Sequence, residues 1–308
     1  MTPTARGQRG QSLDGVVLLD KPLGLTSQSA VTRVKRLLGA AKAGHTGTLD
    51  PMATGLLPIA LGQATKFSHG LLEAEKSYRA TVRLGIKTTT GDLEGEVVAR
   101  STVDCDAQAV NDALSRFRGE ITQVPPMYSA LKHRGKPLYT YARNGTQIER
   151  APRRVTILRL ELESFELPDM CIDVTCSKGT YIRALAEDIG NVLGCGATLA
   201  ALTRTRVGGF DIGRAVALEA LEALRSEERL RWVHPVDSLV ADLPEIGIDC
   251  DAARRLVWGQ QVRCQPTPRA PGMIVRVYGP DQTFLGIGDI TDDGLLVPRR
   301  LVSNGSAA

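Results

Sequence analysis

The sequence has no apolar run long enough to cross a membrane. Its longest apolar stretches, such as residues 15–19 and 55–61, are far shorter than the roughly 20 residues that a membrane-spanning helix needs. Arg6 and Arg9 near the N-terminus are not followed by an apolar segment of signal-peptide length. We therefore expect a cytoplasmic protein that has no membrane partner.

Cysteines at metal-ligand spacing are also missing. The six cysteines include no Cys-x-x-Cys pair, and none of the four histidines stands beside them at the spacing of zinc ligands. A chain of 308 residues can build a core without disulfides, and a reducing cytoplasm keeps thiols free. These absences predict free thiols, no structural metal and no disulfide framework.

Internal repeats and low-complexity segments are absent as well. Hydrophobic residues make up 43% of the chain and charged residues 23%, which is close to the average for globular proteins and excludes wholesale disorder. The length of 308 residues exceeds the usual size of one compact domain. The sequence therefore predicts one large domain and a smaller one.

The net charge of +4 is distributed unevenly. Between Lys132 and Arg154 there are seven basic residues and one acidic residue, so the rest of the chain carries a small negative charge. Tyr139 and Tyr141 lie among these charges and Tyr128 lies just before them. Such a segment is often only a solvated loop, but basic and aromatic side chains together favour a surface that binds phosphates and stacks bases.

Hydrophobic periodicity predicts both helices and strands in the first 224 residues. Thr26 or Ser27 is suited to cap a helix that ends at Gly39. Alternation predicts a strand over 78–84, and we expect residues 96–101 to pair with it in antiparallel fashion. Further strands are expected at 16–19, 155–162 and 171–176, and further helices at 107–117, after Gly179 and at 218–224.

The stretch 236–248, which contains Pro244 and Gly247, is the best candidate for a domain boundary. Short strands separated by Gly-Pro and Asp-Gly turns are expected beyond it, at 273–277, 284–288 and 294–297. Such a pattern is typical of a small β-barrel.

The segment from Gly44 to Leu57, GHTGTLDPMATGLL, nominates a functional site. Its glycines allow a backbone to approach a ligand closely, and Asp50 precedes a proline that favours an extended conformation. Taken alone, Asp50 and His45 are more often turn residues than catalysts. The segment has neither the Lys-Ser/Thr ending of a phosphate-binding loop nor a second carboxylate nearby.

Five sequence blocks stand out: LLDKPLGLTS at 18–27, GHTGTLDPMATGLL at 44–57, KSY at 76–78, VPPMYSALK at 124–132 and SKGTYIRALAEDIG at 177–190. Together they closely resemble the TruB family of tRNA pseudouridine synthases. They occur in the family's order across residues 15–207, and their joint occurrence is much more specific than any one of them. The part after Ile246 resembles the PUA-like RNA-binding domain of bacterial members.

The resemblance implies an α+β fold. We expect a mixed, mainly antiparallel catalytic domain over residues 15–245, with a basic inserted lobe at about 124–154. A PUA-like β-barrel is expected over 246–303, and the segments 1–14 and 304–308 are expected to be tails.

The resemblance also implies that Asp50 is the catalytic aspartate. It would act without metal or cofactor on the uridine at position 55 in the T loop of tRNA. Tyr78 matches the aromatic residue that stacks on the target uracil and is a candidate for handling the C5 proton, and Arg183 is expected to pair with Asp50. The residues leave open whether Asp50 attacks C1′, attacks the uracil ring or removes the 2′ proton.

Three further residues match the family's substrate pocket. His45 corresponds to the histidine that helps hold the flipped-out nucleotide, and Tyr181 and Leu202 correspond to pocket residues. Thr203 stands where the family would have another basic residue, which affects the expected phosphate contacts rather than the chemistry. Phosphate contacts in the basic lobe are expected from Lys132, Arg134, Lys136 and Arg143.

The expected partner is therefore the T stem-loop of tRNA, bound by a monomer without an obligatory protein partner. Two alternatives use the same residues differently. The chain could be a non-enzymatic RNA-binding or RNA-folding protein, or a related synthase directed to other RNA by a guide ribonucleoprotein. The presence of Asp50, Tyr78 and Arg183 argues against the first, and the long basic insertion resembles stand-alone bacterial enzymes.

Overall fold

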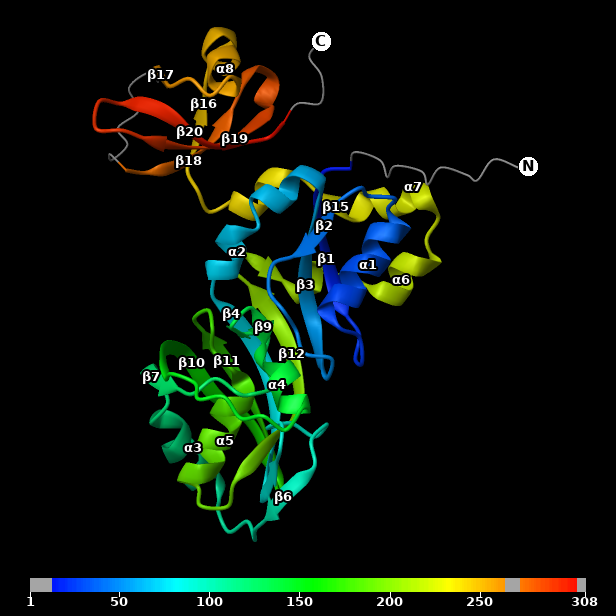
Figure 1. Ribbon diagram of the computed structural model, residues 1–308, viewed down its shortest axis with the longest axis vertical. Coiled ribbons are helices and arrows are strands. Elements are labelled where there is room, and N and C mark those ends of the chain that lie inside the picture. The colour runs from blue at the N-terminus through cyan, green and yellow to red at the C-terminus, as the bar shows by residue number, and fades with distance from the viewer. Residues whose placement is uncertain (1–12, 264–271, 304–308) are drawn as a thin grey trace, which may run out of the picture.

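The computed structural model describes residues 13–263 and 272–303 (Figure 1). The expected C-terminal tail, and all of the expected N-terminal tail except Leu13 and Asp14, lie outside these ranges. None of the helices in the described ranges is long and apolar enough to span a membrane.

A large mixed sheet organises residues 15–234. Within the described residues it has eleven strands, and eight of them follow the spatial order β14-β1-β3-β12-β4-β11-β10-β7. The short strands β2 (Ala43–His45), β13 (Phe210–Asp211) and β15 (Val233–His234) pair with β3, β12 and β1. The eight strands of the path are β1 (Gly15–Lys21), β3 (Ala53–Leu61), β4 (Lys76–Leu84), β7 (Gly119–Gln123), β10 (Arg153–Glu166), β11 (Asp169–Cys176), β12 (Ala197–Val207) and β14 (Val216–Ala217).

Most pairs in this sheet are antiparallel. β4 runs antiparallel to both β11 and β12, so both of its edges are paired with neighbouring strands. β12 runs parallel to β3, and β14 runs parallel to β1. The mixed, mainly antiparallel architecture predicted from the sequence is confirmed.

Helices bury the apolar side chains of one sheet face. Val31 of α1, Leu114 of α3 and Leu185 of α5 pack into one large core with side chains of the strands. Burial of this apolar surface supplies the main stabilisation of the domain. The helices of this part are α1 (Ser27–Leu37), α2 (His69–Glu73), α3 (Ala107–Ser115), α4 (Leu138–Arg143), α5 (Ile182–Val192), α6 (Leu218–Ala223) and α7 (Ser226–Arg229).

Thr26, rather than Ser27, caps α1. The Thr26 hydroxyl accepts a hydrogen bond from the backbone N–H of Ser29 at 3.0 Å. The helix ends before Gly39, whose φ of +61° suits a glycine and stops further helical bonding. Both ends of this helix therefore follow the sequence signals.

The expected pairing of residues 96–101 with the strand over 78–84 is wrong. β6 (Val97–Arg100) pairs instead with β5 (Ile86–Thr88) in a separate two-stranded ribbon. Both edges of β4 are already paired, with β11 and β12, so β4 offers no free edge on which β6 could pair.

The basic lobe contains a strand hairpin and a helix, and is not merely a solvated loop. A hairpin of β8 (Lys132–His133) and β9 (Lys136–Pro137) turns at Arg134 and Gly135, both of which have positive φ. The helix α4 follows directly, and the chain then enters β10.

The C-terminal part forms a second, curled sheet of five strands, which lies at one end of the long axis in Figure 1. Its order is β16-β18-β19-β20-β17, and three of these strands correspond to the three predicted ones. The helix α8 (Cys250–Val257) packs on it, although the sequence analysis did not predict this helix. The strands are β16 (Glu245–Gly247), β17 (Val262–Arg263), β18 (Ile274–Tyr278), β19 (Phe284–Ile290) and β20 (Leu295–Leu301).

An aromatic cluster joins the two sheets. The Phe284 ring lies 5.4 Å from that of Phe67 and 5.6 Å from that of Tyr278. The Tyr278 hydroxyl donates to Asp237 Oδ2 at 2.7 Å, and Lys66 Nζ donates to the carbonyl oxygen of Leu301 at 3.0 Å. The C-terminal sheet is thus attached to the main domain through apolar and polar contacts.

Candidate active site

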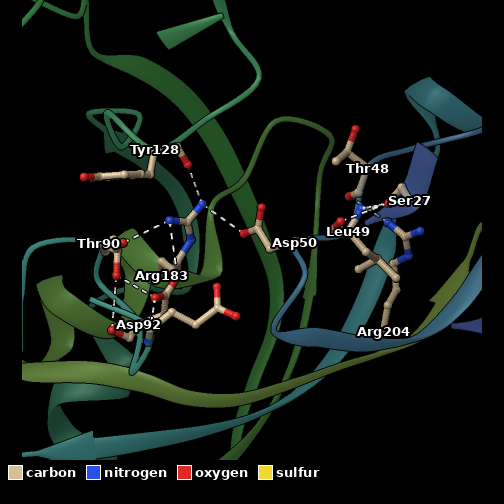
Figure 2. A network of polar contacts seen from close by, with 10 residues as sticks. Ser27, Thr48, Leu49, Asp50, Thr90, Asp92, Tyr128, Arg183 and Arg204 are labelled. Carbon is tan, nitrogen blue, oxygen red and sulfur yellow. Dashed lines mark hydrogen bonds and ion pairs between the residues drawn. The ribbon is translucent and has the colours of Figure 1, made fainter. Parts of the chain in front are cut away.

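Asp50 lies on the loop between β2 and β3, and several contacts fix this loop. Ser27 Oγ accepts from the backbone N–H of Leu49 at 2.8 Å and donates to the carbonyl oxygen of Leu49 at 2.9 Å (Figure 2). The N–H of Gly24 donates to the carbonyl oxygen of Pro51 at 2.8 Å. The residues on both sides of Asp50 are therefore held by the segment that leads into α1.

Arg204 of β12 fixes the start of the same loop. Its side chain is 1% exposed and donates three hydrogen bonds to backbone carbonyl oxygens. Nε donates to Leu56 at 2.8 Å, Nη2 to Gly47 at 3.1 Å and Nη1 to Thr48 at 3.4 Å. The burial of Arg204 excludes direct contact with an RNA backbone outside the pocket.

Asp50 forms an ion pair with Arg183 in the first turn of α5. Asp50 Oδ2 lies 2.9 Å from Arg183 Nη2, and the Asp50 side chain keeps 39% of its surface exposed. Arg183 is only 4% exposed, so it is not an ordinary surface charge. The pair therefore consists of a buried cation and a carboxylate that opens into a cavity.

Arg183 is held from several directions (Figure 2). Nη1 donates to the carbonyl oxygen of Thr90 at 2.9 Å, and Nη2 donates to that of Tyr128 at 2.7 Å. A second carboxylate, Asp92 Oδ2, lies 3.4 Å from Nη1. Asp92 is 4% exposed and accepts hydrogen bonds from Thr90 Oγ1 and from the N–H of Glu94.

Burial raises the pKa of Asp50 above its usual value, while the Arg183 charge opposes this shift and the Asp92 charge adds to it. Arg183 therefore favours the ionised form of the Asp50 carboxylate, whereas burial favours its neutral form. Burial likewise raises the pKa of Tyr78, against the nearby positive charge of Arg204, so its phenol stays neutral at neutral pH.

One cavity of about 360 Å³ collects five of the six pocket residues expected from the sequence. Asp50 lies at one wall, and the others come from β4, β12 and the start of α5. Tyr78 lies directly across from Arg204 in the register of β4 and β12. The five residues are Asp50, Tyr78, Tyr181, Arg183 and Leu202.

His45 faces a second cavity, of about 500 Å³, that meets the first at Asp50 and Arg183. Tyr128, Tyr139 and Arg143 of the basic lobe also line it. Burial lowers the pKa of His45, and the charge of Arg204 lowers it further, so the imidazole is neutral at neutral pH. The sixth expected residue therefore lies beside the pocket rather than in the same cavity.

Three family models match the chain in sequence. A model described as TruB family pseudouridylate synthase (N terminal domain) matches residues 35–182, and one described as tRNA pseudouridylate synthase B C-terminal domain matches 183–241. Pseudouridine synthase II TruB, C-terminal, matches residues 244–302. A protein named tRNA pseudouridine synthase B from Burkholderia mallei (strain ATCC 23344) is 53% identical over 99% of both chains.

The chain belongs to the TruB family. Another relative with the same name, from Aromatoleum aromaticum, is 54% identical and covers 96% of this chain and 95% of its own. Among solved structures, a Cbf5-Nop10-Gar1 complex contains a chain that is 27% identical with a TM-score of 0.72. That match covers 94% of this chain and 84% of the other.

The basic lobe of this TruB family chain divides into two groups. The Arg143 side chain reaches the second cavity and lies 5.4 Å from the centre of the Tyr139 ring. Lys132, Arg134 and Lys136 are exposed on the hairpin and line neither cavity. Tyr141, expected among the base-stacking residues, instead donates its hydroxyl proton to the carbonyl oxygen of His133 at 3.1 Å.

Several buried polar residues at this TruB family site were missed by sequence reasoning. Asp92 contacts Arg183, and Lys21 and Lys76 donate to backbone carbonyls beside the cavities. Burial lowers the pKa of both lysines to about 8. The two lysines lie in two of the five sequence blocks that resemble the TruB family. The loop that carries Asp92 has no such motif, and only its two glycines distinguish it.

No group of three or more histidine, cysteine, aspartate or glutamate residues in the described ranges is arranged to hold a metal ion. Asp50 pairs with one arginine, which a further carboxylate also contacts, and two tyrosines line the same cavity. This donor set is suited to proton transfer and electrostatic stabilisation.

Proposed function

We propose that this enzyme isomerises the uridine at position 55 in the T loop of tRNA to pseudouridine, with Asp50 as the essential catalytic group. Membership of the TruB family makes the chain a pseudouridine synthase that acts on tRNA. The observation that best supports the role of Asp50 is its ion pair with the buried Arg183 at the wall of a cavity.

The reaction needs an extruded nucleotide. The N1–C1′ bond of uridine breaks, the base turns and C5 joins C1′, and these atoms are inaccessible within a stacked loop. Flipping the nucleotide out costs a few kcal/mol, which contacts inside the pocket offset. The cavity of about 360 Å³ beside Asp50 has room for a pyrimidine ring.

The pocket also has to retain the detached base. Tyr78 offers an aromatic face for stacking, and Leu202 provides an apolar wall. We propose that the neutral Tyr78 phenol takes part in moving the C5 proton and that Tyr181 completes the enclosure. His45, in the adjoining cavity, would hold the neighbouring part of the flipped strand.

Asp50 has to be ionised for each of the three open routes. Attack on C1′, attack on the ring and removal of the 2′ proton all use a carboxylate lone pair. Arg183 favours this ionised form and fixes one carboxylate oxygen. The roles require no cofactor.

The exposed basic lobe supports the proposed RNA partner. Lys132, Arg134 and Lys136 project from a hairpin beyond the cavities, and Arg143 lies at the edge of the second cavity. These charges are suited to phosphates of the T stem. We propose that a monomer binds the tRNA in the cytoplasm without a further protein.

The substitution Asp50→Asn tests this function. Asparagine keeps the shape of the side chain but can neither ionise nor act as a nucleophile or base, so pseudouridine formation in a T stem-loop RNA should stop while RNA binding persists. Asp112→Asn, on the exposed face of α3, is the matched control. Activity of Asp50→Asn within about tenfold of wild type, or about 1.4 kcal/mol of barrier, would contradict the assignment.

Mapping the product tests the position and the two alternatives. Purified enzyme alone should convert U55 of a tRNA transcript and leave its other uridines unchanged. Binding without any pseudouridine would favour a non-enzymatic RNA-binding role. A requirement for added guide RNA would favour the guide-directed alternative.

A further inference from the structure

Arg204 is a buried cation without a carboxylate partner among the described residues. Its three donors all bind backbone carbonyls, of Gly47, Thr48 and Leu56. Among the described residues, the guanidinium charge is balanced by the dipoles of these carbonyls and by the neutral Tyr78 phenol. Burying an uncompensated charge costs free energy, so the position calls for an explanation.

Arg204 lines the first cavity together with Asp50 and Tyr78, and it lies directly across from Tyr78 in the register of β4 and β12. The Arg204 charge lowers the pKa of Lys21, of Lys76 and of His45, and it opposes the effect of burial on the pKa of Tyr78. Lys76 and Tyr78 line the first cavity, and His45 lines the second. A charge acting in such a low-dielectric site has a larger effect than it would in water.

The other cations near the pocket are less able to supply an unpaired positive charge. Arg183 already faces the two carboxylates Asp50 and Asp92. Lys21 and Lys76 have pKa values of about 8 and donate to backbone carbonyls. Arg204 alone among these four combines a permanent charge with the lack of an anionic partner in the described part of the chain.

The proposed reaction creates negative charge on the base by every open route. If Asp50 attacks C1′, or if the 2′ proton is removed, the N1–C1′ bond breaks and its electron pair leaves on uracil. If Asp50 adds to the ring, the electron pair of the C5–C6 double bond moves towards O4 and gives an enolate. A nearby cation lowers the barrier in each case, because this charge is greater in the transition state than in bound uridine.

We propose that Arg204 stabilises the negative charge that develops on the uracil ring during isomerisation. This inference rests on the proposed function. It assigns to β12 an electrostatic role separate from the Asp50–Arg183 pair, and it accounts for a charge that is buried among backbone carbonyls and the Tyr78 phenol.

The test combines a substitution with a change of leaving group. Arg204→Gln removes the charge, and T stem-loop RNAs carry uridine or 5-fluorouridine at the target position. Fluorine withdraws electrons from the ring, so 5-fluorouracil needs less stabilisation as an anion. We expect Arg204→Gln to lower the single-turnover rate at which the target nucleotide is consumed about 100-fold for uridine and about tenfold for 5-fluorouridine. RNA affinity should change less than about threefold.

The controls separate charge from structure. Arg79→Gln removes an exposed arginine of β4, which is paired with Asp173 away from the cavities, and should leave both rates unchanged. Arg204→Lys keeps a charge, so it should lose less activity than Arg204→Gln. Thermal unfolding verifies that each variant is folded. If Arg204→Gln is not, the same comparison is made with Arg204→Lys, whose displaced charge should still slow the reaction of uridine more than that of 5-fluorouridine, and equal losses would again overturn the inference.

Equal losses with the two RNAs would overturn the inference, because a damaged loop would slow both substrates alike. A folded Arg204→Gln variant with wild-type rates would overturn it as well. Failure of the proposed function is distinguishable, since the wild-type enzyme would then form no pseudouridine in the uridine RNA.

Discussion

At the scale of single residues, the ionisation of Asp50 depends on how one buried arginine is shared. Arg183 faces Asp50 and Asp92 at 2.9 Å and 3.4 Å, and two backbone carbonyls complete its surroundings. Asp92 thus has two opposite effects. Its charge raises the pKa of Asp50, yet its contact with Arg183 holds the guanidinium in place.

Asp92→Asn should therefore change both the rate and the pH profile. We expect the single-turnover rate at neutral pH to fall about tenfold or more, or about 1.4 kcal/mol, because Arg183 loses a charged contact. Removing the Asp92 charge should also lower the pKa of Asp50, so the acid limb of the profile should move to lower pH. Rates measured from pH 4 to 8 with saturating enzyme would check both effects, and an acid limb that moved to higher pH would contradict the assigned sign.

At the scale of elements, Lys76 joins the end of α2 to the start of β4. Its ammonium donates to the carbonyl oxygens of Leu71, Leu72 and Ala74, at 3.0, 2.8 and 2.5 Å. Burial, together with a smaller contribution from the nearby Arg204 charge, lowers its pKa from 10.5 to about 8. The folded enzyme therefore releases a proton at a pH where the unfolded chain still holds it.

This difference predicts how stability responds to pH. Between about pH 8 and pH 10 the unfolded state binds more protons, so the free energy of unfolding of wild type should rise relative to Lys76→Met by up to about 1.4 kcal/mol per pH unit. Denaturant unfolding of both proteins at several pH values gives this difference. A difference that stayed constant over the range would show that Lys76 keeps its ordinary pKa.

The basic lobe is an element whose charges should act mainly on binding. Replacing Lys132, Arg134 or Lys136 by glutamine should reduce the slope of log affinity against log salt by about 0.7 to 0.9 per residue, because fewer counterions are released. The saturated rate should stay near wild type, since these residues line neither cavity. Binding of tRNA at several salt concentrations checks this, with the exposed Lys35 of α1 replaced by glutamine as a control.

Arg143 is expected to behave differently from the hairpin residues. It lines the second cavity together with Asp50, so Arg143→Gln should lower the saturated rate as well as the salt slope. If the slope of log affinity against log salt stayed unchanged in the Arg143 variant and in all three hairpin variants, the lobe would not contact RNA phosphates and its charges would only face solvent.

At the scale of the whole molecule, the aromatic cluster around Phe284 connects the C-terminal sheet to the main domain. Phe284→Ala should lower the free energy of unfolding by about 2 kcal/mol, because the ring is half-buried and contacts Phe67 and Tyr278. The single-turnover rate with a T stem-loop should stay within about twofold, since the cluster is remote from both cavities. Thermal unfolding and rate measurements below the transition check the two parts, and a large loss of rate would show that the interface shapes the active site.

The sequence by itself determined the local elements and the family of the protein. Alternation was enough to find β4, the capping signal of Thr26 was enough to begin α1, and the blocks around Asp50 and Arg183 were enough to identify the family. These features depend on residues close together in the chain. The roles of the individual site residues remain predictions until the variants are measured.

Only the tertiary structure decided which distant groups meet. It placed Asp92 beside Arg183, buried Arg204 behind the Asp50 loop and gave β6 a partner other than β4. A local pattern carries no information about whether a strand edge is already occupied or whether an arginine will be surrounded by carbonyls. Those outcomes depend on packing between segments far apart in sequence, where burial and the competition for hydrogen bonds are settled together.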